Sequence, residues 1–205
     1  MNILLFVSGA FVLLAGIEWL KRVCTLPTSF LRRLAHIGAG VLNIIAPLFV
    51  EPSAIIGVNV VFALLLVVGR RHHLLSGIQN VERHTYGEIF FPLGIAVAAL
   101  SMLPGHQLAF QYGVAIMGIS DAVAGFVGEQ WGGRVLSFVS GQKTILGSVS
   151  FFLSSVLIGV VCLPINGIGF WVLPLVLTMA EACLVFGLDN LVLPILAGVL
   201  FGLVI

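Results

Sequence analysis

Long apolar stretches separated by short polar ones run along nearly the whole chain, and this pattern predicts membrane-spanning helices. An α-helix needs about 20 mostly apolar residues, within a range of roughly 17–25, to cross the hydrocarbon core of a bilayer. Stretches near this length lie at 2–20, 34–50, 54–69, 87–103, 107–127, 147–163, 168–187 and 190–205. The pattern therefore predicts an all-α, polytopic transmembrane bundle of seven or eight spans, the last being the weakest because Pro194 lies near its start.

Composition excludes a soluble globular protein. The 205 residues are 60% hydrophobic and 8% charged, whereas a soluble domain carries about 25% charged residues. So few polar side chains cannot cover a water-exposed surface. No Pro- or Ser-rich linker and no clear repeat interrupts the chain, so we expect a single integral membrane domain over residues 1–205, without a nucleic-acid partner. The oligomeric state is left open.

Positive charge gathers in alternate loops. The loops at 50–53, 104–107 and 164–167 contain no Lys or Arg. The other long loops contain all nine: Lys21, Arg22, Arg32, Arg33, Arg70, Arg71, Arg83, Arg134 and Lys143. Lys and Arg accumulate in the cytoplasmic loops of membrane proteins. We therefore predict a cytoplasmic-membrane protein whose N-terminus lies outside and whose basic loops lie inside.

Seven of the eight acidic residues fall on the same predicted side, which points to a cavity there. A carboxylate at the centre of a span costs roughly 2.5–3.5 kcal/mol, so Asp121 and Glu181 are expected to face polar surroundings. Glu181 and Asp189 would lie within about 80° of each other on one continuous helix. Carboxylates of this kind bind Mg²⁺ beside phosphates. These residues could also have structural roles instead of binding metal. Asp189 or Asn190 could cap a helix, and Glu88 could interact with the positive N-terminal end of its helix.

The stretch 128–148 has features of a phosphate site. Gly132 and Gly133 can adopt positive φ and turn their N–H groups outward, and successive N–H groups form anion-binding concavities. Lys143 and Thr144 precede the apolar stretch that starts at Gly147, so we expect them at a helix N-terminus, which attracts phosphate. The alternative is a plain loop whose Lys follows the charge rule, and the Gly-x-x-x-x-Gly-Lys signature of P-loops is absent.

Five motifs in order resemble those of the dolichol, phytol and farnesol kinase family. They are Arg32-Arg33-x-x-His36-x-x-x-Gly40, Tyr86-Gly87-Glu88-Ile89-Phe90-Phe91-Pro92-Leu93-Gly94, Ser120-Asp121-x-x-Ala124-x-x-x-Gly128 with Gly132-Gly133-Arg134, Lys143-Thr144-x-x-Gly147-Ser148, and Glu181 with Asp189-Asn190-Leu191-x-x-Pro194. The chain departs from the family at Ser120, where Gly is frequent, and at Arg134, where Lys is frequent. It is also shorter than eukaryotic dolichol kinases.

The resemblance implies CTP-dependent phosphorylation of a membrane isoprenoid alcohol at the cytoplasmic face, with Mg²⁺ as cofactor. Residues and resemblance together predict four catalytic groups, namely Glu88, Asp121, Lys143 and Asp189. Nucleotide contacts are expected from Ser120, Gly128, Gly132, Gly133, Arg134, Lys143, Thr144, Gly147 and Ser148. The predicted metal ligands are Asp121, Glu181 and Asp189, and the predicted substrate-side residues are Arg32, His36, Glu181 and Asn190. The alternatives are a CTP-dependent cytidylyltransferase that makes a CDP-lipid, and a lipid or small-solute transporter.

Overall fold

The structure is a computed structural model that describes residues 2–72, 85–136, 143–162 and 167–204. Within these ranges the regular elements are helices, which confirms the predicted all-α class. They are α1 (Asn2–Val23), α2 (Thr28–Ile45), η1 (Ala46–Leu48), α3 (Pro52–Arg71), α5 (Gly87–Met102), α6 (Gln107–Ala115), η2 (Ile116–Asp121), α7 (Ala122–Trp131), α8 (Ile145–Cys162), α9 (Gly169–Cys183) and α10 (Asp189–Val204).

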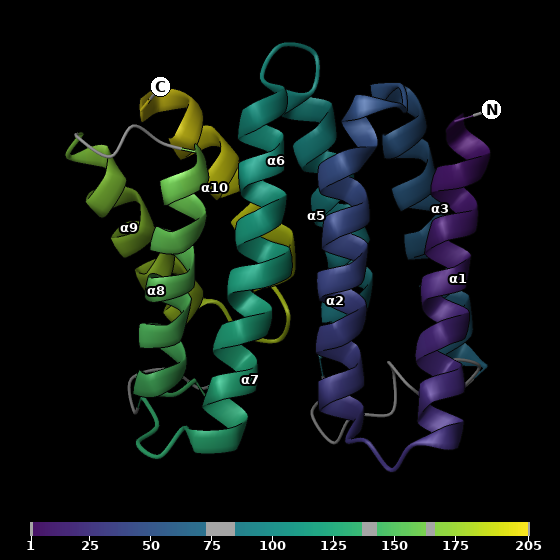
Figure 1. Ribbon diagram of the computed structural model, residues 1–205, viewed down its shortest axis with the longest axis horizontal. Helices are drawn as coiled ribbons and strands as arrows, with labels where there is room; N and C mark the ends of the chain where they lie inside the picture. Colours follow the sequence, from purple (N-terminus) through teal and green to yellow (C-terminus); the bar gives the residue numbers. More distant parts are fainter. Residues whose placement is uncertain (1, 73–84, 137–142, 163–166, 205) are drawn as a thin grey trace.

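The helices pack side by side and run alternately up and down the bundle (Figure 1). Both chain termini lie at the upper end in that view, and the basic ends of α1, α2 and α3 lie at the lower end. The predicted gathering of positive charge at one end of the bundle is therefore present among the described residues. Arg83 lies outside them.

Four helical segments are long and apolar enough to cross a membrane: α1, α3, the continuous segment Gln107–Trp131, and α8. The apolar helices α5, α9 and α10 are shorter, with 16, 15 and 16 residues. The predicted count of seven or eight spans and the outside position of the N-terminus therefore stay predictions, while the described residues have the helices of an integral membrane protein.

Small residues bring the central helices close together. A methyl group built on Gly94 of α5 would collide with the carbonyl oxygen of Asn190, and one on Gly113 of α6 would collide with that of Pro194. Because lipid gives helices no hydrophobic reason to associate, such close backbone packing is a main source of cohesion between membrane helices. The two glycines thus hold the start of α10 against α5 and α6.

A turn of π-helix, η2, interrupts the segment Gln107–Trp131. Here Gly118 faces Gly40 of α2, with 3.1 Å between a methyl carbon built on Gly118 and the Gly40 Cα. Single π turns inside α-helices occur frequently at functional sites. This one ends at Asp121.

Candidate active site

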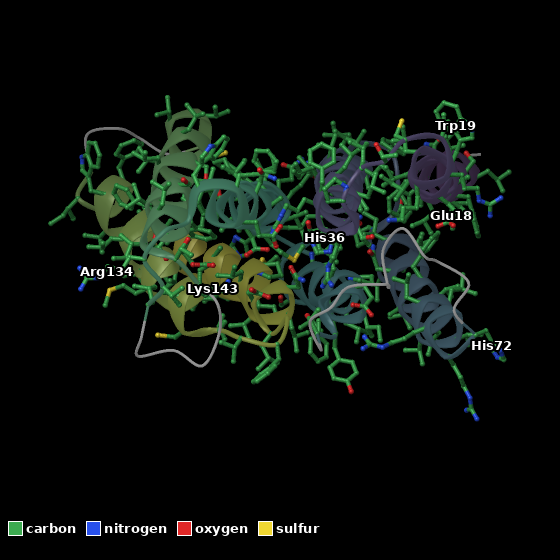
Figure 2. All side chains as sticks on the ribbon, turned by 90° about the horizontal axis from the view of Figure 1, so that it is seen from below. Glu18, Trp19, His36, His72, Arg134 and Lys143 are labelled. Atoms are coloured by element: carbon green, nitrogen blue, oxygen red, sulfur yellow. The ribbon has the colours of Figure 1, made fainter. Side chains whose placement is uncertain are left out.

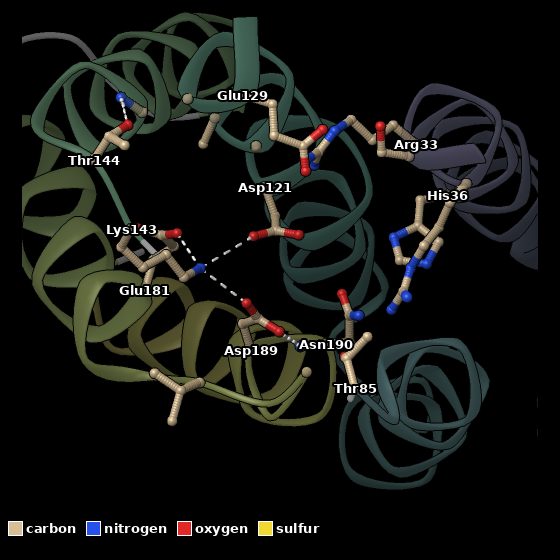
Figure 3. A pocket seen from close by; sticks show the side chains of 18 of the residues that line it. Arg33, His36, Thr85, Asp121, Glu129, Lys143, Thr144, Glu181, Asp189 and Asn190 are labelled. Atoms are coloured by element: carbon tan, nitrogen blue, oxygen red, sulfur yellow. Dashed lines mark hydrogen bonds and ion pairs between the residues drawn. The ribbon is translucent and has the colours of Figure 1, made fainter. Parts of the chain in front are cut away.

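A polar cavity of about 410 Å³ lies among the ends of α2, α7, α8, α9 and α10. Its charged lining residues are Arg32, Arg33, Asp121, Glu129, Lys143, Glu181 and Asp189. The ends of five helices therefore supply one charged site, as Figure 3 shows.

Lys143 lies at the centre of this site, and three carboxylates point toward its ammonium group (Figure 3). Nζ lies 2.9 Å from Asp189 Oδ2 and 3.9 Å from Asp121 Oδ1, and it donates a further short hydrogen bond to Glu181 Oε1. The predicted metal ligands are thus assembled together, and the predicted phosphate-binding lysine stands among them.

Backbone pairing fixes the position of Lys143. Val135 and Thr144 form an isolated antiparallel bridge. Beside it, the Leu136 N–H donates to the Lys143 carbonyl oxygen over 2.9 Å. The Thr144 hydroxyl accepts a hydrogen bond of 3.1 Å from the Gly147 N–H, and so caps the first turn of α8. The predicted location of Lys143 and Thr144 at a helix N-terminus is confirmed.

Two opposing effects act on the pKa of Lys143. Burial alone lowers it, because a charged group loses its hydration. The nearby carboxylates of Asp121, Asp189 and Glu181 favour the charged form, and their combined effect holds the pKa above the ordinary lysine value. Lys143 is therefore a permanent cation at neutral pH.

The carboxylates come from three different helices. Asp121 is the last residue of the π turn, Glu181 lies in the last turn of α9, and Asp189 begins α10. Glu181 and Asp189 lie on two separate helices, so the angle expected if one continuous helix carried both does not apply. The chain leaves α9 after Cys183 and turns through positive φ at Phe186 (60°) and Gly187 (88°). This turn, and not helical periodicity, brings both carboxylates to Lys143.

Unpartnered polar atoms are concentrated around the cavity. Among the described residues, buried atoms without a hydrogen-bond partner include five that belong to lining residues: Arg33 Nε, His36 Nε2, Ser148 Oγ, Glu181 Oε2 and Asn190 Oδ1. A buried polar group normally has a partner, so each exception calls for an explanation. A bound polar ligand would satisfy donors and acceptors of this mixture.

The α2 side of the cavity is basic. Arg33 forms an ion pair of 2.5 Å with Glu129 of α7, and a methyl group built on Gly125 would collide with the Arg33 guanidinium. Arg33 and Glu129 line the cavity but were absent from the predicted site. The sequence signal for Arg33 was its place next to Arg32. Nothing in the spacing of Glu129 marked it.

Most predicted site residues line the cavity, including Gly128, Thr144, Gly147, Ser148, Arg32, His36 and Asn190. The glycines Gly128 and Gly147 act by packing, because they face each other and let α7 approach α8. On the opposite wall the Asn190 amide donates to the Gly87 carbonyl over 3.0 Å, which ties α10 to α5.

Four predicted site residues, besides Glu88, lie outside the lining of the cavity. Ser120 is buried beside the cavity, and Gly132, Gly133 and Arg134 lie beyond the end of α7. Positive φ is present at Gly133 (56°), as expected, whereas Gly132 has a helical φ of −55°. The Arg134 side chain is solvent-exposed and points away from the site (Figure 2).

Glu88 belongs to a separate ion-pair group at the start of α5. Its oxygens lie 2.5 Å from Arg70 Nη1 and 3.7 Å from Arg32 Nη2. The side chain is 3% exposed and lines a smaller neighbouring cavity. Glu88 therefore neutralises two arginines at the edge of the site and does not reach Lys143.

Comparison with known proteins gives one informative relative. The chain is 32% identical over 198 residues to a phytol kinase of Synechocystis sp., and the match covers 91% of this chain and 83% of the relative. No protein-family model matches the chain, and no solved structure does. A match of this identity over nearly the full length of both proteins goes beyond shared hydrophobicity, and the chain belongs to the phytol kinase family of polyprenol-type kinases.

Proposed function

We propose that this protein transfers the γ-phosphoryl group of CTP to the hydroxyl of a membrane isoprenoid alcohol, at the cytoplasmic face, giving the alcohol monophosphate and CDP. The observation that carries the proposal is the group formed by Lys143, Asp121, Glu181 and Asp189 in a polar cavity at one end of an apolar bundle. Phosphoryl transfer depends mainly on positioning and on neutralising charge, and this cavity supplies groups for both.

The charge of the cavity supports a metal–nucleotide complex as the ligand. Three cationic and four carboxylate side chains line it, so a free triphosphate would meet net negative charge. Among the described residues no trio of carboxylates is preorganised as a metal site. The donor chemistry nevertheless fits Mg²⁺, since Asp121, Glu181 and Asp189 converge on one cation and Glu181 Oε2 has no partner. These carboxylates would hold Mg²⁺, which neutralises charge on the transferring phosphoryl group.

The side chains of the site have distinct roles in this proposal. Lys143 exchanges its carboxylate contacts for phosphate oxygens, and the Ser148 hydroxyl at the start of α8 donates to the same phosphates. Arg33 adds a cation from the facing helix. One of the carboxylates accepts the hydroxyl proton of the alcohol as the alcohol oxygen bonds to the γ-phosphorus and the bond from that phosphorus to CDP breaks.

The proposed acceptor, a lipid alcohol, follows from the position of the charged cavity at the end of apolar helices. A charged cavity at the end of apolar helices can receive a nucleotide from water and a lipid hydroxyl from the bilayer interface. The Synechocystis relative is a phytol kinase by name, and we extend its acceptor class to this chain as an isoprenoid alcohol. CTP as the donor rests on the motif resemblance.

The position of a radioactive label in CTP tests this function. Purified protein in detergent–lipid micelles is incubated with Mg²⁺, a panel of farnesol, geranylgeraniol, phytol and longer polyprenols, and CTP labelled at either the α- or the γ-phosphorus. We expect γ-label in the lipid fraction and α-label in CDP, with less transfer from ATP.

Other outcomes identify the alternatives. In a parallel reaction with a lipid phosphate, such as phosphatidate, in place of the alcohols, a cytidylyltransferase would put α-label into the lipid as CDP-lipid and release γ-label as pyrophosphate. If folded protein transfers neither label to any alcohol, the kinase proposal is wrong, and a transport assay in liposomes becomes the appropriate test.

A further inference from the structure

A second, apolar cavity of about 80 Å³ adjoins the charged one. It lies between α1, α2, α3 and α5, and its walls are mostly aliphatic and aromatic, including Phe6, Ala10, Leu13, Ala39, Phe62 and Phe91. Nothing in the proposed nucleotide chemistry uses this space.

His36 connects the two cavities, because its side chain lines both of them. Its ring stacks on Phe91 with centroids 4.5 Å apart, and the residue is only 9% exposed. Its Nε2 atom is buried without a hydrogen-bond partner. An unsatisfied hydrogen-bonding atom thus lies where the charged cavity meets the apolar cavity, and Figure 3 shows His36 beside the charged one.

We propose that the apolar cavity binds the first isoprene unit of the acceptor alcohol, and that His36 Nε2 hydrogen-bonds its hydroxyl at the junction. This inference rests on the proposed function, because it assigns the acceptor of the same reaction. An alcohol with an apolar tail fits the junction, since its hydroxyl can both donate and accept a hydrogen bond.

The other polar residues of the apolar cavity, Asn43, Asn59 and Glu88, already have hydrogen-bond or ion-pair partners. The Asn59 amide donates to Asn43 Oδ1 over 2.8 Å, and the Asn43 amide donates to the Ala39 carbonyl over 2.9 Å. Glu88 is paired with Arg70 and Arg32. Among the described residues that line this cavity, His36 Nε2 is thus the buried side-chain polar atom without a partner, which suits a single hydroxyl better than the several oxygens of a phospholipid head group.

The size of the cavity indicates how the rest of the tail lies. Its volume of about 80 Å³ is smaller than the cavity of about 150 Å³ that holds a benzene molecule. Only the part of the tail nearest the hydroxyl fits without displacement of side chains. The remainder must leave toward lipid along α1, which is mostly exposed and meets α3 through the Phe11 and Phe62 rings at 5.3 Å.

Two alanines on α1 provide a matched test. Ala10 lines the apolar cavity, whereas Ala15 on the same helix is exposed and lies outside it. We expect Ala10→Phe to raise the KM for geranylgeraniol at least tenfold and to leave the KM for CTP unchanged. Ala15→Phe should match the wild-type protein in both constants. Equal alcohol KM values for the two variants would overturn the cavity assignment.

Substitutions of His36 test the hydroxyl contact. His36→Leu should lower kcat/KM for the alcohol at least tenfold, with little change in the KM for CTP. His36→Gln keeps a polar group in the cavity and should recover part of that loss. A His36→Leu enzyme with wild-type alcohol kinetics, or a loss confined to CTP binding, would contradict the contact.

Photo-crosslinking of the wild-type protein tests the cavity even if a variant fails to fold or if no alcohol is phosphorylated. Wild-type protein is irradiated with a farnesol analogue that carries a diazirine in its first isoprene unit, and the labelled peptides are mapped. Label in α1, α2 or α3 supports the cavity, whereas label confined to α8 or α9 overturns it. Wild-type protein that is labelled in the cavity but transfers no phosphate would overturn the proposed function alone.

Discussion

At the scale of single residues, Lys143 is the group on which the charged cavity depends most. It is the cation that three carboxylates share, so its loss removes both a phosphate contact and the neutralisation of Asp121, Glu181 and Asp189. We predict that Lys143→Ala lowers kcat/KM for CTP by about 10²–10³-fold, the range for loss of one electrostatic contact to a transition state. Steady-state kinetics with CTP and farnesol measures this.

Arg71→Ala is the matched control for Lys143→Ala, because Arg71 is an exposed cation at the end of α3. We expect this variant to keep wild-type kinetics. Equal kinetics for Lys143→Ala and Arg71→Ala would show that Lys143 does not act on the nucleotide.

Neutralising the carboxylates tests the metal site. Asp121→Asn and Asp189→Asn keep the size of the side chain but remove its charge, and we predict a loss of at least about 100-fold in kcat, comparable to losing one electrostatic donor. The concentration of Mg²⁺ needed for half-maximal activity should rise in any variant that remains measurable. Glu51→Gln, at the exposed start of α3, serves as the control. Retention of most activity by both aspartate variants would place the metal elsewhere.

Glu88 gives a prediction of a different kind, because the structure separates it from Lys143. Glu88→Gln leaves Arg32, whose side chain is 13% exposed, with a weaker partner, and breaking one side of a buried ion pair costs up to about 3–5 kcal/mol. We therefore expect a lower thermal midpoint along with reduced activity. A catalytic role would instead reduce kcat at unchanged stability, so the two measurements together distinguish the roles.

At the scale of helices, contact between α5 and the start of α10 positions Asp189 and Asn190. Because a methyl group on Gly94 would collide with the Asn190 carbonyl oxygen, we predict that Gly94→Ala lowers the thermal midpoint in detergent and the activity together. Gly57→Ala in α3 meets nothing within 4 Å and should keep or slightly raise the midpoint, since Ala favours helix by up to about 1 kcal/mol over Gly. A Gly94→Ala protein as stable as Gly57→Ala would show that this contact can relax.

At the scale of the whole molecule, the placement of charge predicts the orientation in the membrane. His106 precedes α6 and Arg134 follows α7, at opposite ends of the bundle, and both are exposed. In a variant without native cysteines, we expect a membrane-impermeant maleimide to label His106→Cys on intact cells and Arg134→Cys only after permeabilisation. The reverse pattern would invert the predicted topology.

Local pattern was sufficient to predict the helices and most of the charged site. Apolar runs predict helices because every backbone group in lipid must be paired within its own segment, and this requirement acts on neighbouring residues only. The same holds for Lys143 and Thr144, whose place before α8 follows from where the apolar run begins. The motifs and their order were enough to predict that Asp121, Glu181 and Asp189 belong to one site.

Tertiary structure decided what each of these residues contacts. The positive-φ turn at Phe186 and Gly187 placed Glu181 and Asp189 on separate helices, and the arginines of α2 and α3 drew Glu88 into a separate ion-pair group. The pairing of Arg33 with Glu129 and the position of His36 between two cavities likewise depend on how α2 packs. The sequence by itself determined the helices and the end of the bundle where charge gathers, since both follow from transfer between water and lipid. Which charged side chains contact one another was decided only by the tertiary structure, because these contacts depend on distances between segments that are remote in the chain.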